Sequence, residues 1–166
     1  MRELFLSMFL ALGLAGFANA QEMTGKAAED TKREILELET AKGKDLVKSP
    51  SQAADWQERF NADGLALTLP DGSTPTRDEL VAMIRSGDVK DEYINHHDYR
   101  VNIYANKDVP HTAVVTWSGD EITVYKGKRE HVFEKTTDVF VKVDGDQWRR
   151  VVHHVSPVPP GVVLLP

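Results

Sequence analysis

The stretch Thr136–Ser156, TTDVFVKVDGDQWRRVVHHVS, decides the fold of this chain. It contains two runs rich in β-branched and aromatic residues, separated by Asp144-Gly145, a dipeptide typical of tight turns. The second run opens on Trp148 and closes on His154 and Ser156. We therefore predict a β-hairpin, from which a curved sheet can direct polar side chains into a cavity.

The chain before this hairpin also shows the alternation of strands. Tyr99, Val101 and Ile103 alternate with polar residues, which is typical of a strand with one buried face. Ser118-Gly119-Asp120 and Lys126-Gly127-Lys128 are predicted turns. The predicted strands are Leu65–Leu69, Tyr93–Tyr104, His111–Ser118, Glu121–Tyr125, Arg129–Val143 and Gln147–Ser156.

Amphipathic segments dominate the first half of the chain. Ile35 and Leu38 belong to an apolar stripe at helical spacing, and Trp56 and Phe60 stand at i and i+4. Thr76-Arg77-Asp78-Glu79 is a capping box, in which the Thr and Glu side chains bind the first free amides of a helix. The predicted helices run from about Thr24 to Val47, from about Ser51 to Ala62 with Asp63-Gly64 ending it, and from the capping box to Gly87.

Three helices and one early strand thus precede a run of antiparallel strands. Segregated helices and strands are typical of the α+β class, in which helices cover one face of a sheet. We predict a cone-shaped barrel, made of a strongly bent antiparallel sheet packed against the three N-terminal helices.

Residues 1–20 have the features of a secretory signal peptide. Arg2 supplies a positive start, Leu4–Phe17 is almost wholly apolar, and Ala18-Asn19-Ala20 is a cleavage site before Gln21. The apolar run is short for a membrane span, so we expect cleavage, with an uncleaved anchor as the alternative. Cleavage predicts a periplasmic or secreted protein with no stable membrane insertion.

The remaining composition narrows the function classes. A formal net charge of −6 disfavours nucleic acid as a partner, since phosphate contact needs clustered Lys and Arg. The chain has no cysteine, which excludes thiol nucleophiles and zinc sites built on thiolate. We predict one domain over residues 21–156, followed by a Pro-rich tail over residues 157–166.

Several motifs together resemble the SnoaL-like, nuclear-transport-factor-2-like (NTF2-like) superfamily, and within it the small domains without assigned function. The resemblance covers roughly residues 28–156. The residues that carry it are Glu37-Leu38-Glu39, Trp56 with Phe60-Asn61-Ala62-Asp63, Pro70-Asp71-Gly72 before Thr76-Arg77-Asp78-Glu79-Leu80, and Thr137–Val141 with Asp144-Gly145, Trp148 and His154-Val155-Ser156.

The resemblance implies an α+β cone that usually forms a homodimer through its outer sheet. The superfamily includes ketosteroid isomerase-like, dehydratase-like and polyketide cyclase-like enzymes, and also non-catalytic binding and dimerisation modules, so the fold does not settle the function. Two segments depart from the pattern. Gly43–Asp55 is longer than the usual link, and the tail after Ser156 is an addition.

His154 and Asp63 are the candidate catalytic residues. Strict alternation from Trp148 puts His154 on the opposite face from His153, and the resembled domains point the histidine six residues after the tryptophan toward the cavity. A neutral imidazole at that position can act as acid or base. Asp63 lies where cone-fold isomerases and cyclases place acidic residues. The alternatives are a histidine bonded to a neighbouring strand and a helix-terminal Asp bound to backbone amides.

For the other polar residues we expect structural roles rather than catalytic ones. Asp138 is expected to face solvent or a dimer partner, because carboxylates are rarely buried unpaired. Alternation places His96 and Asp98 on one face and His97 on the other, so a metal site would need a further ligand such as His111 or His131. We predict no metal site and no cofactor. The residues predicted to line the pocket are Trp56, Phe60, Trp117, Trp148 and Arg150.

Three functions fit this sequence. We rank first a domain that binds a small apolar or amphipathic molecule in the cone. The second is an enzyme of the isomerase, dehydratase or cyclase type that uses Asp63 and His154 as acid–base groups. The third is a structural dimerisation module.

Overall fold

A computed structural model describes residues 21–106, 109–143 and 147–159. The predicted signal peptide, the Asp144-Gly145 turn and most of the Pro-rich tail lie outside these residues. Within them, no helix is long and apolar enough to span a membrane. In chain order the elements are β1 (Gln21–Glu22), α2 (Lys26–Leu46), α3 (Pro50–Phe60), β2 (Asn61–Thr68), α4 (Arg77–Ser86), β3 (Val89–Asn106), β4 (Val109–Tyr125), β5 (Lys128–Val143) and β6 (Gln147–Pro157).

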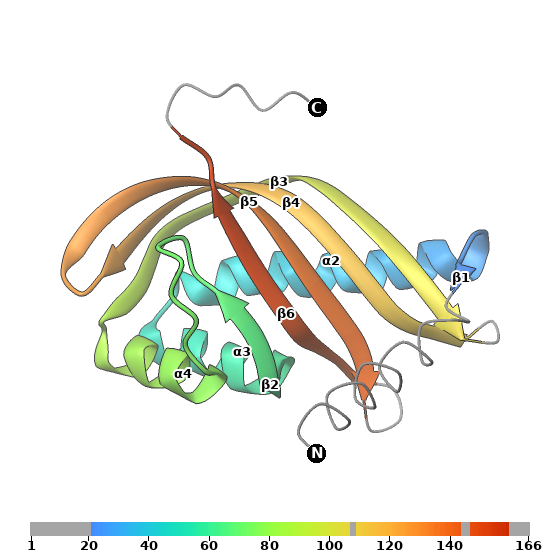
Figure 1. The fold of residues 1–166 in the computed structure, drawn as a ribbon, viewed down its shortest axis with the longest axis horizontal. Coiled ribbons are helices and arrows are strands. Elements are labelled where there is room, and N and C mark those ends of the chain that lie inside the picture. The colour runs from blue at the N-terminus through green and yellow to red at the C-terminus, as the bar shows by residue number, and fades with distance from the viewer. Residues whose placement is uncertain (1–20, 107–108, 144–146, 160–166) are drawn as a thin grey trace, which may run out of the picture.

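The strands form one curled, unclosed sheet in the order β1-β3-β4-β5-β6-β2, with the helices on its concave side (Figure 1). All neighbouring strands pair antiparallel except β2 and β6, which pair parallel. The predicted α+β cone with three helices is confirmed. The sheet is mixed rather than purely antiparallel, because β2 enters it beside the last strand.

Local chemistry explains where the helices begin and end. Ser49 accepts a hydrogen bond from the Gln52 amide at the start of α3, and both halves of the predicted Thr76–Glu79 capping box are formed on α4. Gly87 ends α4 in the left-handed conformation, with φ of 82°. These boundaries agree with the predicted helices to within about two residues, the usual scatter of helix ends.

Two segments predicted to break the chain lie inside strands, Asp63-Gly64 in β2 and Ser118-Gly119-Asp120 in β4. The second helix ends at Phe60, before Asp63-Gly64, because Asn61 is already extended and its buried amide bonds Gln57. Ser118-Gly119-Asp120 is not a turn, since β4 continues through it. A Cβ on Gly119 would lie 2.6 Å from Cζ3 of Trp117, so the glycine is required by side-chain packing rather than by chain reversal.

The turn between β4 and β5 is confirmed as a tight bend. Tyr125 pairs with Lys128 across a two-residue loop, in which Lys126 and Gly127 both have positive φ. At the C-terminal end of β6, Pro157 still pairs with Glu134 of β5 and is the last residue of the strand. The prediction that pairing stops at Ser156 is therefore one residue short.

An irregularity in β6 changes which residues face the helices. Val139 aligns with Val152, but Phe140 aligns with Arg150, so Val151 is an extra residue in β6. This bulge reverses the alternation that begins at Trp148. The buried side of the strand therefore carries Trp148, Arg150 and then Val155, with the ring of His153 largely covered.

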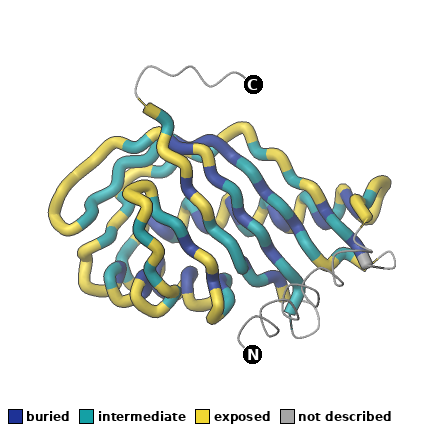
Figure 2. The backbone as a smooth tube through the Cα atoms, viewed as in Figure 1, coloured by how far each residue is buried: buried dark blue, intermediate teal, exposed yellow. Residues whose placement is uncertain are grey.

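The core has two parts, and buried positions alternate with less buried ones along the central strands (Figure 2). One part packs α2 against the sheet, and the other packs α3 and α4 against β2. The first contains Ile35, Ile103, Ala113, Val115, Trp117, Phe140 and Trp148. The second contains Leu46, Ala53, Ala54, Leu65, Leu67, Leu80, Val81 and Ile84.

Candidate functional site

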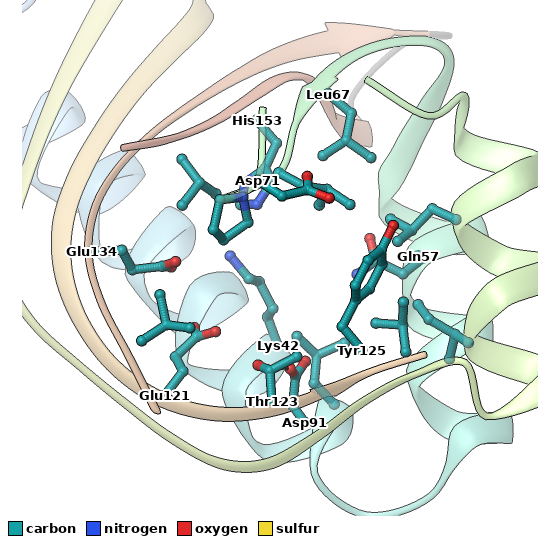
Figure 3. A pocket seen from close by; sticks show the side chains of 18 of the residues that line it. Lys42, Gln57, Leu67, Asp71, Asp91, Glu121, Thr123, Tyr125, Glu134 and His153 are labelled. Atoms are coloured by element: carbon teal, nitrogen blue, oxygen red, sulfur yellow. Dashed lines mark hydrogen bonds between the residues drawn. The ribbon is translucent and has the colours of Figure 1, made fainter. Parts of the chain in front are cut away.

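A cavity of about 150 Å³ is lined by residues of both parts of the core and by the sheet (Figure 3). Its apolar wall comes mainly from helix ends and strands. Its polar side chains come from α2, α3, four of the strands and the loop after β2. The apolar lining residues are Leu46, Leu67, Leu69, Pro70, Leu80, Ile84, Val89, Val132 and Val155. The polar and aromatic ones are Lys42, Gln57, Asp71, Asp91, Trp117, Glu121, Thr123, Tyr125, Glu130, Glu134, Arg150 and His153.

Asp138 is the centre of a buried polar network beside this cavity. It is fully buried, so the prediction that it faces solvent or a dimer partner is wrong. Trp117 Nε1 donates to it at 3.1 Å, His153 Nδ1 at 2.6 Å and Arg150 Nη1 at 3.3 Å, and Lys42 Nζ lies 3.4 Å away. Burial opposes its charge, but Lys42 and the other partners outweigh burial and hold the pKa of Asp138 well below its usual range.

Arg150 connects Asp138 to α3 and β2. Its Nε donates to Asn61 Oδ1 at 2.9 Å, and its Nη2 donates to Gln57 Oε1 at 3.0 Å. The guanidinium also lies over the ring of Trp56, 5.2 Å from the centroid. Because Gln57 also accepts from Asn61 at 2.6 Å, the guanidinium is held in one orientation.

Lys42 projects from α2 and its ammonium lies in the cavity (Figure 3). It pairs with Glu39 at 3.1 Å, one turn earlier on the same helix. Burial disfavours the ammonium, but Asp138 and Glu39 outweigh burial and raise the pKa of Lys42. Burial also raises the pKa of Glu39, and its Oε1 has no hydrogen-bond partner among the described residues. Lys42 is therefore a fixed positive charge at the cavity.

His153 is a neutral imidazole that faces the cavity. Burial lowers its pKa to about 4, against the pull of Asp138. Because a carboxylate only accepts, His153 Nδ1 carries the proton of this hydrogen bond and Nε2 carries a lone pair. A histidine oriented in this way by a carboxylate can accept a proton from a bound molecule.

Three carboxyl groups on the sheet wall favour the protonated form. Burial and the neighbouring Glu121 raise the pKa of Glu134 to about 8 and that of Asp91 to about 7. Burial, with Asp138 as a further repulsive charge, raises the pKa of Glu121 to about 7. At neutral pH this wall therefore holds ionisable groups close to half-titration, which is a frequent property of functional sites.

The two predicted catalytic residues do not line this cavity. His154 is exposed and its ring bonds Ser156 at 3.3 Å, so the prediction that it faces the cavity is wrong. The bulge at Val151 is the reason, because it brings His153 inward instead. Asp63 is also exposed and forms an ion pair with Arg77, so it does not line the cavity either.

The residues predicted to line the pocket are divided between the cavity and the core. Trp117 and Arg150 line the cavity. Trp56 and Trp148 are buried, but they pack in the core rather than at the cavity. Phe60 packs against Trp56 with the rings tilted by 37° and their centroids 5.0 Å apart. Sequence alternation does not distinguish a core aromatic from a cavity aromatic.

The histidines of β3 are arranged differently from the prediction. His96 is covered and stacks on Trp117 with the ring centroids 3.7 Å apart. Asp98 has a positive φ of 55° at an irregularity in the β3–β4 pairing, so it turns outward and bonds His97 instead of sharing a face with His96. His111 and His131 are exposed, and His131 pairs with Asp120.

Lys42, Glu39, His153 and Glu134 were not predicted as site residues. A signal for the first two exists in the sequence, because positions 28, 31, 35, 39, 42 and 46 form one stripe at helical spacing and all are buried. A charged residue within such a stripe indicates a buried ionic site. No comparable signal marks His153, since nothing in the sequence places the bulge.

No protein-family model and no curated protein sequence matches the chain. Solved structures do match it. An NTF2-like protein of unknown function in nutrient uptake from Rhodospirillum rubrum is 21% identical, with 75% of this chain and 98% of that chain covered and a TM-score of 0.64. A provisionally named calcium/calmodulin-dependent kinase II association domain from Exiguobacterium sibiricum is 10% identical, covering 84% and 99%, with a TM-score of 0.65.

A provisionally named dehydratase of the NTF2-like family from Streptomyces avermitilis is 18% identical, covering 78% of this chain and 98% of that chain, with a TM-score of 0.57. These three proteins carry names from different functional classes, so the likeness identifies an architecture and leaves the chemistry to the site. The curled sheet, the three helices and these likenesses agree: the chain has the NTF2-like α+β cone fold.

Proposed function

We propose that the cavity binds a small amphipathic molecule, with its apolar body against the leucine-rich wall and a polar, oxygen-bearing group at Lys42 and His153. One observation carries this proposal. The cavity is apolar where helix ends, β2 and the following loop meet, and polar where Lys42, His153 and the carboxyls of the sheet converge (Figure 3). An apolar wall with a few convergent polar groups is the usual composition of a small-molecule site.

The volume limits the ligand. About 150 Å³ accommodates a molecule of roughly the size of one six-membered ring. Lys42 Nζ provides charge-assisted donors, and His153 Nε2 provides an acceptor. A hydroxyl on such a ring therefore matches both groups, since it accepts from Lys42 and donates to His153, whereas a carbonyl oxygen matches Lys42 alone.

Ligand-observed saturation-transfer NMR with a panel of monocyclic phenols and cyclic ketones tests this proposal. Val132→Phe should fill the cavity and remove the transfer signals, since Val132 lies on its wall. Val139→Phe is the matched control, because Val139 is on the same strand but on the opposite face. Equal signals from both variants, or none from the unmodified chain, would refute the proposal.

The Asp138–His153 hydrogen bond favours a second candidate, an acid–base enzyme of the dehydratase or isomerase type. His153 Nε2 accepts a proton from carbon or oxygen of the bound molecule, and Glu134, protonated near neutral pH, returns one. These residues replace Asp63 and His154 in the role first assigned to that pair. His153→Gln should abolish turnover of any substrate found and leave binding within about a few-fold, whereas unchanged turnover would exclude this mechanism.

A further inference from the structure

A mixed nitrogen and oxygen cluster lies across three neighbouring strands next to the cavity. His96 on β3, Glu121 on β4 and Glu134 on β5 each offer one ligand atom, and all three atoms lie within 4.8 Å of one another. We propose that His96, Glu121 and Glu134 bind a divalent transition-metal ion whose remaining coordination positions face the cavity.

Sheet register explains why these side chains meet. Gly119 pairs with His96 on one side and with Glu134 on the other, so the three residues form one row across the sheet. The glycine leaves the centre of this row without a side chain of its own. Glu121 follows two residues later on the same face of β4 and completes the triangle.

Packing holds the imidazole of His96 in one orientation. The His96 ring stacks on Trp117, and its Nε2 points at Glu121 Oε1, 2.5 Å away. Trp117 is itself held by its hydrogen bond to Asp138. Supporting contacts that orient a ligand histidine in this way are a regular part of metal sites.

The two carboxyl groups have few competing partners. Glu134 is 3% exposed, and its described hydrogen bond comes from the Thr136 hydroxyl at 3.3 Å. Among the residues that the structure describes, no lysine or arginine forms an ion pair with Glu121 or Glu134. The nearby Lys42 is engaged by Glu39 and Asp138. A bound cation would neutralise carboxylates that are otherwise buried close to each other.

The donor set selects the class of ion. One imidazole with two carboxylates, and no thiolate in the chain, suits Zn²⁺, Mn²⁺ or Co²⁺ better than the all-oxygen coordination of Ca²⁺ and Mg²⁺. Ligand bonds of about 2.0–2.2 Å place ligand atoms about 3–3.5 Å apart, which small rotations of the two glutamates achieve. Since Glu121 and Glu134 line the cavity, water or a bound oxygen group can occupy the open positions.

Isothermal titration of the chelator-treated chain with Zn²⁺ should show one high-affinity site, and Co²⁺ should give a visible absorption band. Glu121→Gln and Glu134→Gln each remove one charged ligand and should weaken Zn²⁺ binding at least tenfold. Glu92→Gln is the matched control, because Glu92 is exposed on β3, pairs with Arg129 and does not line the cavity, so binding should be unchanged. No organic ligand is needed, so the result is independent of the proposed small-molecule binding. A bound ion would exclude Glu134 as the proton donor of the second candidate function.

Unchanged binding in both glutamine variants would overturn the proposal, since the ion would then bind at exposed histidines such as His97 or His131. Absence of stoichiometric binding to the unmodified chain would overturn it as well. If a variant does not fold, imidazole NMR of the unmodified chain decides. Zn²⁺ should shift the His96 ring resonances and leave those of His111 unchanged, and the reverse pattern excludes the site.

Discussion

Removing the charge of Asp138 should be the most damaging conservative substitution in this protein. Asp138→Asn keeps the size of the side chain, but it leaves Lys42 and Arg150 buried with a weaker counter-charge. The new amide also presents two hydrogens to the donors at one of the two oxygen positions, either Trp117 and Lys42 or His153 and Arg150. Breaking a buried ionic interaction from one side typically costs about 3–5 kcal/mol, and we expect a loss of this size in the free energy of unfolding.

Urea denaturation measures this loss, with the m-value as a check that the unfolding remains two-state. Against a typical total stability of about 5–15 kcal/mol, a loss of this size should lower the urea midpoint clearly. Asp120→Asn is the control, because Asp120 pairs with the exposed His131 and should cost less than about 1 kcal/mol. A loss under about 1 kcal/mol in Asp138→Asn would show that the network does not depend on this charge.

Three further predictions concern packing and pH. Gly119→Ala should destabilise the chain by about 1–3 kcal/mol through the clash with Trp117. Gly64→Ala is the control and should change stability little, because no heavy atom lies within 4 Å of the new Cβ. Equal effects of the two substitutions in thermal melts would refute the packing argument. Thr76→Ala should cost about 1 kcal/mol by removing the capping box of α4, measured by urea denaturation, and an effect near zero would show that the cap is dispensable. Asp91 has a folded pKa of about 7, above its unfolded value of 3.8, so the folded state binds this proton more tightly than the unfolded state. The resulting stabilisation is complete below pH 3.8 and is lost as pH rises through 7, by up to about 1.4 kcal/mol per pH unit relative to Asp91→Asn. Parallel stability–pH curves for the two proteins would contradict this.

The sequence was sufficient for the architecture because periodicity and caps are local properties. The stripe that contains Ile35, the capping box at Thr76 and the end of the third helix at Gly87 each depend on a few neighbouring residues, and each is formed as predicted. The two wrong breaks have a different origin. Gly119 and Asn61 are fixed by side chains that contact them in the folded protein, Trp117 in one case and Gln57 with Arg150 in the other.

The site was harder to predict, because one extra residue reverses the face of a strand. Strict alternation selects His154, and the bulge at Val151 selects His153. The prediction that Asp138 faces solvent or a dimer partner was wrong because it did not take account of tertiary contacts. The rule that carboxylates avoid burial holds only when no partners are available. The partners of Asp138 come from α2, β4 and β6, and sequence spacing does not bring these elements together.

The distribution of charge also separates the three candidate functions. Burying Lys42, Arg150 and Asp138 requires desolvation that an apolar core of the same shape avoids, so such a network adds little net stability. A module that only dimerises through its outer sheet has no use for this arrangement inside the cone. A site that must orient a polar group, a proton or a metal ion does require such a buried charge network. Apolar side chains cannot supply fixed charges and a pre-oriented imidazole at a cavity wall. The buried charges therefore favour a cavity with a ligand over a purely structural role.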